Sequence, residues 1–204
     1  MRVIAGVAKG HQLLGPRGRG TRPTSDRLRG AIFDALGERV GYGRVLDLYA
    51  GTGALGIEAL SRGAEQADFV ESDRAMCAVI RANLERTRLA DRGRVLCRRV
   101  EDVLPELTGP YDLILMDPPY DDPRRDEILA TLATSSLISP DTLVVVEHAA
   151  RRPPPDRIGR LVLWKRRRHG DGAFSIYIVA EPLVPETAHS SETAPASEPV
   201  PEAC

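Results

Sequence analysis

Residues 45–56 read Val-Leu-Asp-Leu-Tyr-Ala-Gly-Thr-Gly-Ala-Leu-Gly, and this stretch decides the fold. Its first half is a short apolar run typical of a buried strand, and its second half combines a glycine turn with the start of a helix. Glycine suits the turn because the backbone must bend sharply and a ligand must approach it with no Cβ in the way. The stretch therefore predicts a strand, a ligand-binding loop and a helix, in that order.

The same alternation of apolar runs and helical stretches continues on the carboxyl side of this unit. Most of the apolar runs have no polar face, which is typical of strands covered on both sides. Strands are expected at 44–48, 67–71, 94–98, 113–116 and 143–147, and helices near 54–62, 73–88 and 123–134. Two further runs, 161–164 and 174–179, are joined through the turn His169-Gly170-Asp171-Gly172. The order predicts an α/β, Rossmann-like fold whose mostly parallel sheet ends in an antiparallel hairpin.

Both ends of the chain differ from this central region. Extended runs at 2–7 and 11–14 predict a small hairpin, and the glycine-rich, basic segment 15–20 predicts a flexible loop. From Pro182 the composition turns to Pro, Ser, Thr, Ala and Glu with no hydrophobic period, which predicts disorder. We therefore divide the chain into a basic hairpin and loop (1–24), a central domain (25–181) and an acidic tail (182–204).

The formal net charge of −1 is a sum over segments of opposite sign. Residues 1–40 carry eight Lys or Arg against three acids, which gives +5, whereas residues 181–204 carry five Glu and no Lys or Arg, which gives −5. Residues 151–168 hold eight basic residues against Asp156 alone. Two basic segments beside a more acidic middle favour a polyanionic partner, although plain solvated surfaces carry such charge runs too.

The chain shows no sequence feature of an exported, membrane or metal-binding protein. No apolar run approaches the roughly 18 residues needed to span a bilayer, and the start of the chain has no secretory signal. Its cysteines, Cys77, Cys97 and Cys204, are widely spaced with no CxxC pair, which argues against a disulfide framework or a zinc site. We expect a cytoplasmic monomer with no metal and no membrane contact.

The glycine loop permits two cofactor interpretations. Gly51, Gly53 and Gly56 satisfy GxGxxG, so an NAD-dependent dehydrogenase has to be considered. Asp47, four residues before the first glycine, favours the second interpretation, because D-x-x-x-G-x-G resembles the cofactor loop of class I S-adenosylmethionine-dependent methyltransferases. A carboxylate here attracts the cationic methionyl end of that cofactor, whereas it repels a pyrophosphate. Its alternative role is to brace the loop by accepting backbone N–H bonds.

Two later positions fit the rest of an adenosyl cofactor. Glu71 ends the next strand, twenty residues after Gly51, where a carboxylate can accept hydrogen bonds from both ribose hydroxyls of either NAD or S-adenosylmethionine. Asp73 is the rival for that role, but capping of the following helix suits it better. Arg99 and Val100 follow the third strand, where methyltransferases of this class contact the adenine.

Leu113-Ile114-Leu115-Met116-Asp117-Pro118-Pro119-Tyr120 is the most informative stretch for the chemistry. It resembles the (D/N)PP(Y/F) motif of methyltransferases that act on exocyclic or amide nitrogen. The lone pair of such a nitrogen is delocalised, so both of its hydrogens must be held while it becomes tetrahedral. Asp117 can accept one N–H and the Pro118 carbonyl the second, because the prolines stiffen the turn, and Tyr120 can stack on the base. A rigid turn with a capping Asp is the alternative explanation.

Six segments together narrow the resemblance to one family. They are RVIAGVAKGHQL, GTRPTSDRLRGAIFDAL, VLDLYAGTGALGIEALSRGA, FVESD, LILMDPPY and HGDGAFSIY. Over about residues 2–180 the chain is similar to the bacterial small-subunit rRNA (guanine-N2)-methyltransferases. The resemblance implies a seven-stranded Rossmann-like sheet with a short N-terminal β-hairpin extension, S-adenosylmethionine as the donor, and a guanine of 16S rRNA in the 30S subunit as the acceptor. Asp34 departs from the family, which commonly has Asn there, and the acidic tail is extra.

The stretch Arg22-Pro23-Thr24-Ser25-Asp26-Arg27-Leu28-Arg29 has a structural and a functional interpretation. Thr24 or Ser25 offers the N-cap oxygen of a helix, and a capped helix with a basic solvent face explains the pattern by itself. Following the family, the helix start lies beside the cofactor pocket and the arginines contact phosphates. The candidate RNA-binding residues are Arg17, Arg19, Arg22, Arg27 and Arg29.

The sequence therefore predicts a methyltransferase acting on guanine N2 of 16S rRNA. The nearest rival is methylation of a different amino nitrogen, such as adenine N6 in DNA or a protein glutamine, because the Asp-Pro-Pro-Tyr motif alone does not select the acceptor. A third and a fourth interpretation are an NAD-dependent dehydrogenase and a ribosome assembly factor without turnover.

Overall fold

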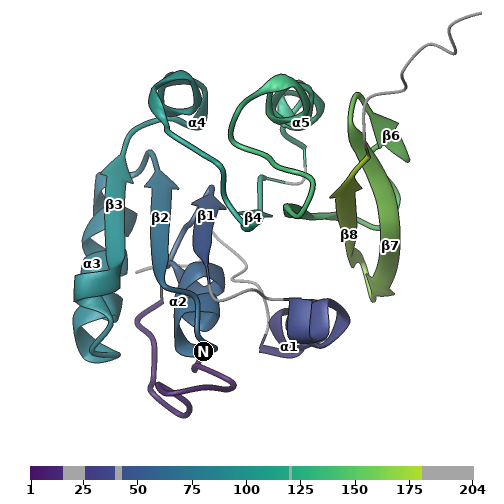
Figure 1. The fold of residues 1–204 in the computed structure, drawn as a ribbon. Helices are drawn as coiled ribbons and strands as arrows, with labels where there is room; N and C mark the ends of the chain where they lie inside the picture. The colour runs from purple at the N-terminus through teal and green to yellow at the C-terminus, as the bar shows by residue number, and fades with distance from the viewer. Residues whose placement is uncertain (16–25, 40–42, 120, 181–204) are drawn as a thin grey trace, which may run out of the picture.

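A computed structural model describes residues 1–15, 26–39, 43–119 and 121–180. Its strands form one sheet in the order β3-β2-β1-β4-β5-β8-β7-β6 (Figure 1). The strands are β1 (Arg44–Leu48), β2 (Gln66–Glu71), β3 (Gly93–Cys97), β4 (Leu113–Met116), β5 (Leu143–Ala149), β6 (Arg157–Ile158), β7 (Leu161–His169) and β8 (Gly172–Val179). The helices are α1 (Asp26–Leu36), α2 (Ala54–Ser61), α3 (Arg74–Arg86), α4 (Val100–Val103) and α5 (Arg125–Thr134), with short 3-10 turns at Gly37–Arg39, Ala90–Arg92 and Leu104–Glu106.

The pairing of the strands confirms the predicted mixed α/β sheet. Strands β3, β2, β1, β4 and β5 run parallel, whereas β8 pairs antiparallel with both β5 and β7. The final hairpin turns at the expected His169–Gly172 segment. An eighth strand, β6, was missed because its two residues, paired with Val162 and Leu161, are too short to show any periodicity.

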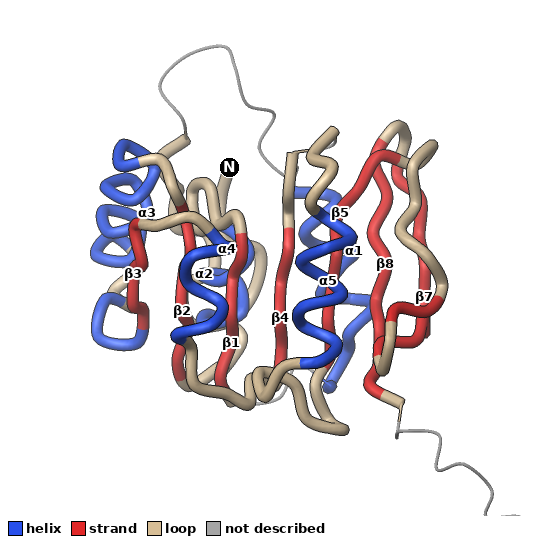
Figure 2. The backbone as a smooth tube through the Cα atoms, turned by 90° about the horizontal axis from the view of Figure 1, so that it is seen from above, coloured by secondary structure: helices blue, strands red, loops and turns tan. Residues whose placement is uncertain are grey.

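Helices cover both faces of the sheet (Figure 2). Helices α1, α2 and α3 pack on one face, around a cluster of buried side chains that includes Ile32, Ile57 and Ile80. Helices α4 and α5 pack on the opposite face, where Val103 and Leu129 join a second cluster. Because each central strand contributes to both clusters, its sequence is apolar on both sides, as predicted for a doubly covered sheet.

The N-terminal segment forms a hairpin-like loop that packs onto α2 and α3. One antiparallel bridge joins Arg2 and Gln12, and the Val3 N–H donates to the His11 carbonyl at 3.0 Å. Val3, Ala8 and Leu13 are buried in the cluster that α1, α2 and α3 share. The boundary at residue 24 and the expected N-caps Thr24 and Ser25 lie outside the described residues, as does the tail 182–204.

The cysteine prediction was wrong. Cys77 in the first turns of α3 and Cys97 at the end of β3 form a disulfide bond. The two are twenty positions apart in sequence, and only the packing of α3 against β3 brings them together. Spacing without a CxxC pair therefore did not reveal the bond. Of the helices that the structure describes, none is long and apolar enough to cross a membrane.

Candidate cofactor and acceptor site

The candidate site lies where the carboxyl ends of β1, β2 and β4 meet. The sheet order places β1 between β2 and β4, so the chain leaves β1 toward one side first and later returns to the opposite side. In open α/β sheets this switch point opens a crevice at the carboxyl ends of the strands, and ligands bind there. Asp47, Glu71 and Asp117 all come from the ends of these strands.

The glycine loop after β1 has the conformation that its sequence predicts. Gly51 and Gly53 have φ angles of +54° and +77°, a region that favours glycine. A Cβ on Gly56 would lie 2.4 Å from the Phe69 ring, so glycine there lets α2 approach β2 closely. The loop and the helix start are therefore held close to the sheet, whereas a Cβ on Gly51 would meet no heavy atom nearer than 4.0 Å.

Asp47 is buried at this loop, with 1% of its surface exposed. Its Oδ2 accepts the Gly56 N–H at 2.9 Å, which confirms the loop-bracing role. Its Oδ1 is buried with no hydrogen-bond partner among the described residues. Burial raises the pKa of Asp47 well above its usual range, and the nearby charges of Asp117 and Glu71 raise that pKa further. A cationic ligand group would offset this cost, so the unpartnered oxygen fits the positively charged methionyl end of S-adenosylmethionine.

Glu71 holds the loop as well as facing the pocket. Its two carboxylate oxygens accept the Gly51 and Asp73 N–H groups, each at 2.8 Å. Each oxygen keeps a further lone pair, so the carboxylate can still accept from a ribose hydroxyl. Asp73 caps α3 through the Ala75 N–H at 2.7 Å, as predicted.

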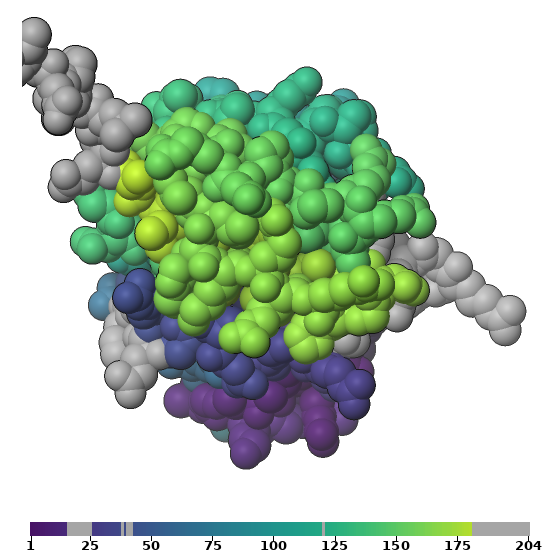
Figure 3. Space-filling view, turned by 90° about the vertical axis from the view of Figure 1, so that its right-hand side faces the viewer, coloured from purple at the N-terminus to yellow at the C-terminus, as the bar shows by residue number. Residues whose placement is uncertain are grey.

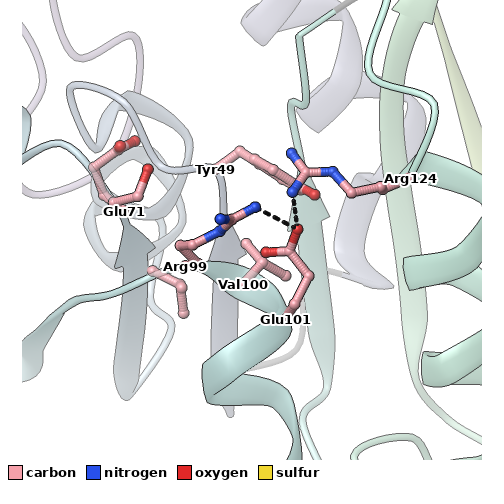
Figure 4. Close-up of a pocket in the computed structure, with 8 residues that line it drawn as sticks. Tyr49, Glu71, Arg99, Val100, Glu101 and Arg124 are labelled. Atoms are coloured by element: carbon pink, nitrogen blue, oxygen red, sulfur yellow. Dashed lines mark hydrogen bonds and ion pairs between the residues drawn. The ribbon is translucent and has the colours of Figure 1, made fainter.

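A pocket opens beside Glu71, between the ends of β1 and β2 and the start of α4 (Figure 4). It brings together Glu71, Arg99 and Val100, the three residues predicted to surround the adenosine. The prediction did not include Tyr49, Val70, Ser72, Glu101 or Arg124, which also line it. The sequence offered a signal for Tyr49, which lies inside the motif of residues 45–56, but none for Arg124.

Charged side chains join the two walls of this pocket. Glu101, in α4, forms ion pairs with Arg99 and with Arg124, which immediately precedes α5 (Figure 4). Arg124 also pairs with Asp122, and its guanidinium holds the pKa of that carboxyl below its usual value. Arg124 therefore links the loop that follows the Asp-Pro-Pro-Tyr motif to the predicted adenine wall.

Tyr49 has a strained backbone at the centre of the site. Its φ is +58°, a backbone angle that residues other than glycine rarely adopt. Its hydroxyl is buried with no partner among the residues that the structure describes, and burial raises its pKa to about 12. Strain of this kind concentrates at functional sites.

Asp117 and Pro118 lie directly beyond β4, at the same edge. The Asp117 N–H donates to the Leu48 carbonyl at 3.4 Å, which ties this turn to β1. Pro118 is buried and Asp117 is partly exposed. Asp117 is near enough to Asp47 for its charge to act on that carboxyl, so the acceptor motif and the cofactor loop adjoin. Tyr120 lies outside the described residues.

One predicted RNA contact is wrong and one is compatible with the structure. Arg29 is fully buried, donates to the Arg2 carbonyl and pairs with Asp26 and with Glu58. It joins α1 to the N-terminal segment and α2, so it cannot reach a phosphate. Arg27 is exposed on α1. Arg17, Arg19 and Arg22 lie outside the described residues.

The structure offers no metal centre within its described residues, where no three His, Cys, Asp or Glu side chains group to hold an ion. The arrangement instead combines a rigid glycine loop, three carboxylates and a stiff proline turn. Such a site can bind an adenosyl cofactor and hold an amino group beside it.

Comparisons with known proteins agree with this geometry. The family model "Conserved hypothetical protein 95" matches residues 1–178. The chain is 35% identical over 181 residues to "Putative rRNA methyltransferase YlbH" of Bacillus subtilis (strain 168), covering 87% of this chain and 98% of the relative. It is 31% identical over 177 residues to "Ribosomal RNA small subunit methyltransferase D" of Escherichia coli (strain K12), covering 87% and 89%. The solved structure titled "Putative methyltransferase yhhF from Escherichia coli" matches with a TM-score of 0.77 and 30% identity, covering 88% of this chain and 98% of that one.

Proposed function

This chain belongs to the Conserved hypothetical protein 95 family, whose model matches residues 1–178, and we propose that it methylates ribosomal RNA of the small subunit. The donor is S-adenosylmethionine and the acceptor is the exocyclic N2 of a guanine in 16S rRNA. One observation carries the proposal: Asp117 and Pro118 adjoin a buried carboxylate, Asp47, that lacks a partner for one oxygen among the described residues. The relatives with rRNA methyltransferase names support the acceptor class.

Four residues of the site would hold the cofactor. Asp47 would face the cationic methionyl end, Glu71 would accept hydrogen bonds from the ribose, and Arg99 and Val100 would flank the adenine. Gly51 and Gly53 let the loop approach the cofactor. When bound, S-adenosylmethionine supplies an electrophilic methyl group on a positively charged sulfur.

The acceptor motif activates the guanine amino nitrogen, which is a poor nucleophile by itself. The Asp117 carboxylate and the Pro118 carbonyl accept hydrogen bonds from the two N–H groups of the guanine amino group. These bonds turn the lone pair of the nitrogen toward the methyl group. As the nitrogen–methyl bond forms, the methyl–sulfur bond would break and leave neutral S-adenosylhomocysteine. Positive charge develops on the nitrogen, and the negative charge of Asp117 stabilises it. One amino proton then leaves through Asp117 to water. Tyr120 stacks on the base and keeps it in line.

The enzyme acts as a cytoplasmic monomer. Its N-terminal segment, 1–24, belongs functionally to substrate binding, where Arg17, Arg19 and Arg22, together with Arg27 of α1, contact phosphates. The acidic tail from Pro182 is dispensable for methyl transfer.

Methyl transfer from labelled S-adenosylmethionine tests the proposal. The acceptors are naked 16S rRNA, assembled 30S subunits and duplex DNA, and nucleoside digestion of the labelled RNA identifies the methylated base. We expect N2-methylguanosine from one or both rRNA substrates and none from DNA. Label in adenine, or in DNA alone, would contradict the proposed acceptor.

Cofactor binding separates the enzyme classes. Calorimetric titration should show that S-adenosylhomocysteine binds and that NAD does not. Tight NAD binding without S-adenosylhomocysteine binding would reject a methyltransferase. Binding of S-adenosylhomocysteine without turnover on any rRNA substrate would instead indicate an assembly factor.

A further inference from the structure

The end of the C-terminal hairpin lies at the same edge of the sheet as the acceptor motif. Strand β7 runs parallel to β4, because β8 between β5 and β7 is antiparallel to both. The register places Met116, Val146, Ser175 and Arg166 in one row across four strands. With strands roughly 4.8 Å apart, Arg166 and the next residue lie about 14 Å from the start of the acceptor turn.

Basic residues from three segments gather at this edge. We use the name basic ledge for Arg125, Arg151, Arg152, Arg166, Arg167 and Arg168. Five of the six lie in residues 151–168, which are green to light green in Figure 3 and form much of the face nearest the viewer.

Hydrogen bonds connect the ledge to the acceptor loop. Arg152 pairs with Asp121, the residue after Tyr120, at 3.0 Å. Arg125 donates to the Arg152 carbonyl at 2.8 Å, and Arg166 donates to the Pro154 carbonyl at 2.7 Å. These contacts join Arg125 and Arg152 to the acceptor loop and hold Arg166 against the segment that follows Arg152. Arg167 and Arg168 continue β7 toward the hairpin tip, on alternate faces of the strand.

Half of the ledge is uncompensated by acidic groups. Arg125, Arg152 and Arg166 pair with Asp126, Asp121 and Asp156 respectively. Arg151, Arg167 and Arg168 are exposed and pair with no carboxylate within the part of the chain that the structure describes. Two further acids lie nearby: Asp171 at the hairpin tip, and the buried Glu147 in the same row of the sheet as Arg167.

The Leu163 N–H donates to the Asp156 carbonyl at 2.7 Å, and beyond that residue no described strand pairs with the outer edge of β7. The exposed guanidinium groups thus remain accessible from the side and from above the acceptor turn. Planar guanidinium groups bind phosphate through paired N–H donors.

We propose that the basic ledge is an RNA-docking surface that holds phosphates of the substrate while its acceptor base enters beside Asp117. This inference rests on the proposed function and deepens it. It adds phosphate contacts near the C-terminal end of the domain to those proposed for Arg27 and the N-terminal arginines. RNA suits the surface because the unpaired charges adjoin the loop where a base must be held, and phosphate contacts supply affinity without reading the sequence.

A matched pair of double variants tests the ledge. Arg167→Gln/Arg168→Gln removes two ledge charges, and Arg81→Gln/Arg88→Gln removes two exposed charges in or just after α3, near the β3 edge of the sheet. Binding of a labelled 16S rRNA transcript is measured over a range of salt concentrations. The ledge variant should bind about tenfold more weakly at low salt and lose about one to two from the slope of log affinity against log salt.

The control variant should leave both quantities unchanged, and both variants should bind S-adenosylhomocysteine as the wild type does. An unchanged salt slope in the ledge variant, or an equal loss in the control, would overturn the ledge. Methyl transfer separates this failure from that of the proposed function. If the wild type methylates rRNA and the ledge variant does so with unchanged KM, the ledge alone is wrong.

Asp121 gives a test of opposite sign. Because Asp121 competes with phosphate for Arg152, Asp121→Asn should tighten RNA binding about threefold at low salt. Adding Arg152→Gln to that variant should remove the gain. A gain that persists in the double variant would show that Arg152 takes no phosphate.

Discussion

Two aspartates, one toward each end of the same sheet, show how differently one domain treats buried carboxylates. Asp47, at the carboxyl end of β1, has one oxygen with no partner among the described residues and a pKa raised by burial. Asp68, in β2, accepts two bonds from Arg94 at 2.8 Å and one from the Tyr111 hydroxyl at 2.6 Å. The first is poised for a ligand, whereas the second is fully satisfied by the protein itself.

The difference teaches where stability and function reside in this fold. Arg44 stacks over the Tyr111 ring beside Asp68, so at the amino-terminal edge of the sheet the protein's own side chains neutralise the buried carboxylate. At the carboxyl-terminal edge of the sheet, the charges of Asp117 and Glu71 raise the pKa of Asp47 further, and Tyr49 has a strained backbone. We infer that the rest of the domain holds this edge in place, and that a ligand can supply the partners that Asp47 Oδ1 and the Tyr49 hydroxyl lack among the described residues.

Loss of Asp117 should have the largest effect. Asp117→Ala should lower turnover by about a hundredfold or more, as expected for one preorganised group in the transition state, while S-adenosylhomocysteine affinity stays nearly constant. Glu71→Ala should do the reverse and mainly weaken cofactor binding. Single-turnover rates and calorimetry measure the two quantities. Equal losses of cofactor affinity in both variants would refute these separate roles.

Loss of Asp68 should come next and affect stability alone. Asp68→Ala leaves the buried Tyr111 hydroxyl without its acceptor, which costs about 2 kcal/mol and lowers Tm by about 6 °C. Arg94→Ala should cost less, because its guanidinium is already largely exposed. Thermal melts measure both. A change in S-adenosylhomocysteine affinity of the folded Asp68 variant would break the contrast between the two edges.

Asp47→Asn should stabilise the fold and weaken cofactor binding. Neutralising a buried, partly unpartnered carboxylate should raise Tm by about 3 °C, or roughly 1 kcal/mol, and weaken S-adenosylhomocysteine binding about tenfold. Since the pKa of Asp47 is raised in the folded state, ionisation destabilises the fold as pH rises above about 4. The stability advantage of the variant should therefore grow with pH. An advantage that is greatest at low pH would contradict this account.

The smallest expected effect is the contribution of His148 to the pH dependence of stability. Burial lowers its pKa, and it lies between the Ala149 carbonyl and the Ser175 hydroxyl, at 2.9 and 3.0 Å. A neutral buried imidazole loses stability as pH falls below its unfolded value of about 6.5. Urea denaturation of the wild type between pH 7 and pH 5 should show this loss, and His148→Gln should reduce it. Identical pH profiles would exclude a contribution from this ring.

The sequence predicted most of the framework because its signals are local. Strands β1 and β4 have the predicted bounds, since each apolar run ends at a polar or glycine turn. Asp73 as a helix cap and the grouping of Glu71 with Arg99 also follow from position after a strand. By contrast, the four-residue helix α4 spans a single turn, which is too short for periodicity to show.

What the sequence missed depends on distant partners. Arg29 reads as a surface residue because arginine is almost never fully buried unless paired, and its partner Glu58 lies in a separate helix. The Cys77–Cys97 bond and the meeting of Arg124 with Glu101 likewise join separate elements. No pattern along the chain records such contacts.

The double duty of Glu71 limits how this enzyme can be re-engineered. A common strategy shortens a ribose-binding side chain to make room for a bulkier cofactor analogue. Here the carboxylate that we propose to bind the ribose also accepts the Gly51 N–H at 2.8 Å. Shortening it would release the glycine loop at the moment it enlarges the cavity, so the two changes are coupled and non-additive. Space for an analogue is better sought on the Arg99 side of the pocket, where the side chain is exposed and leaves the loop untouched.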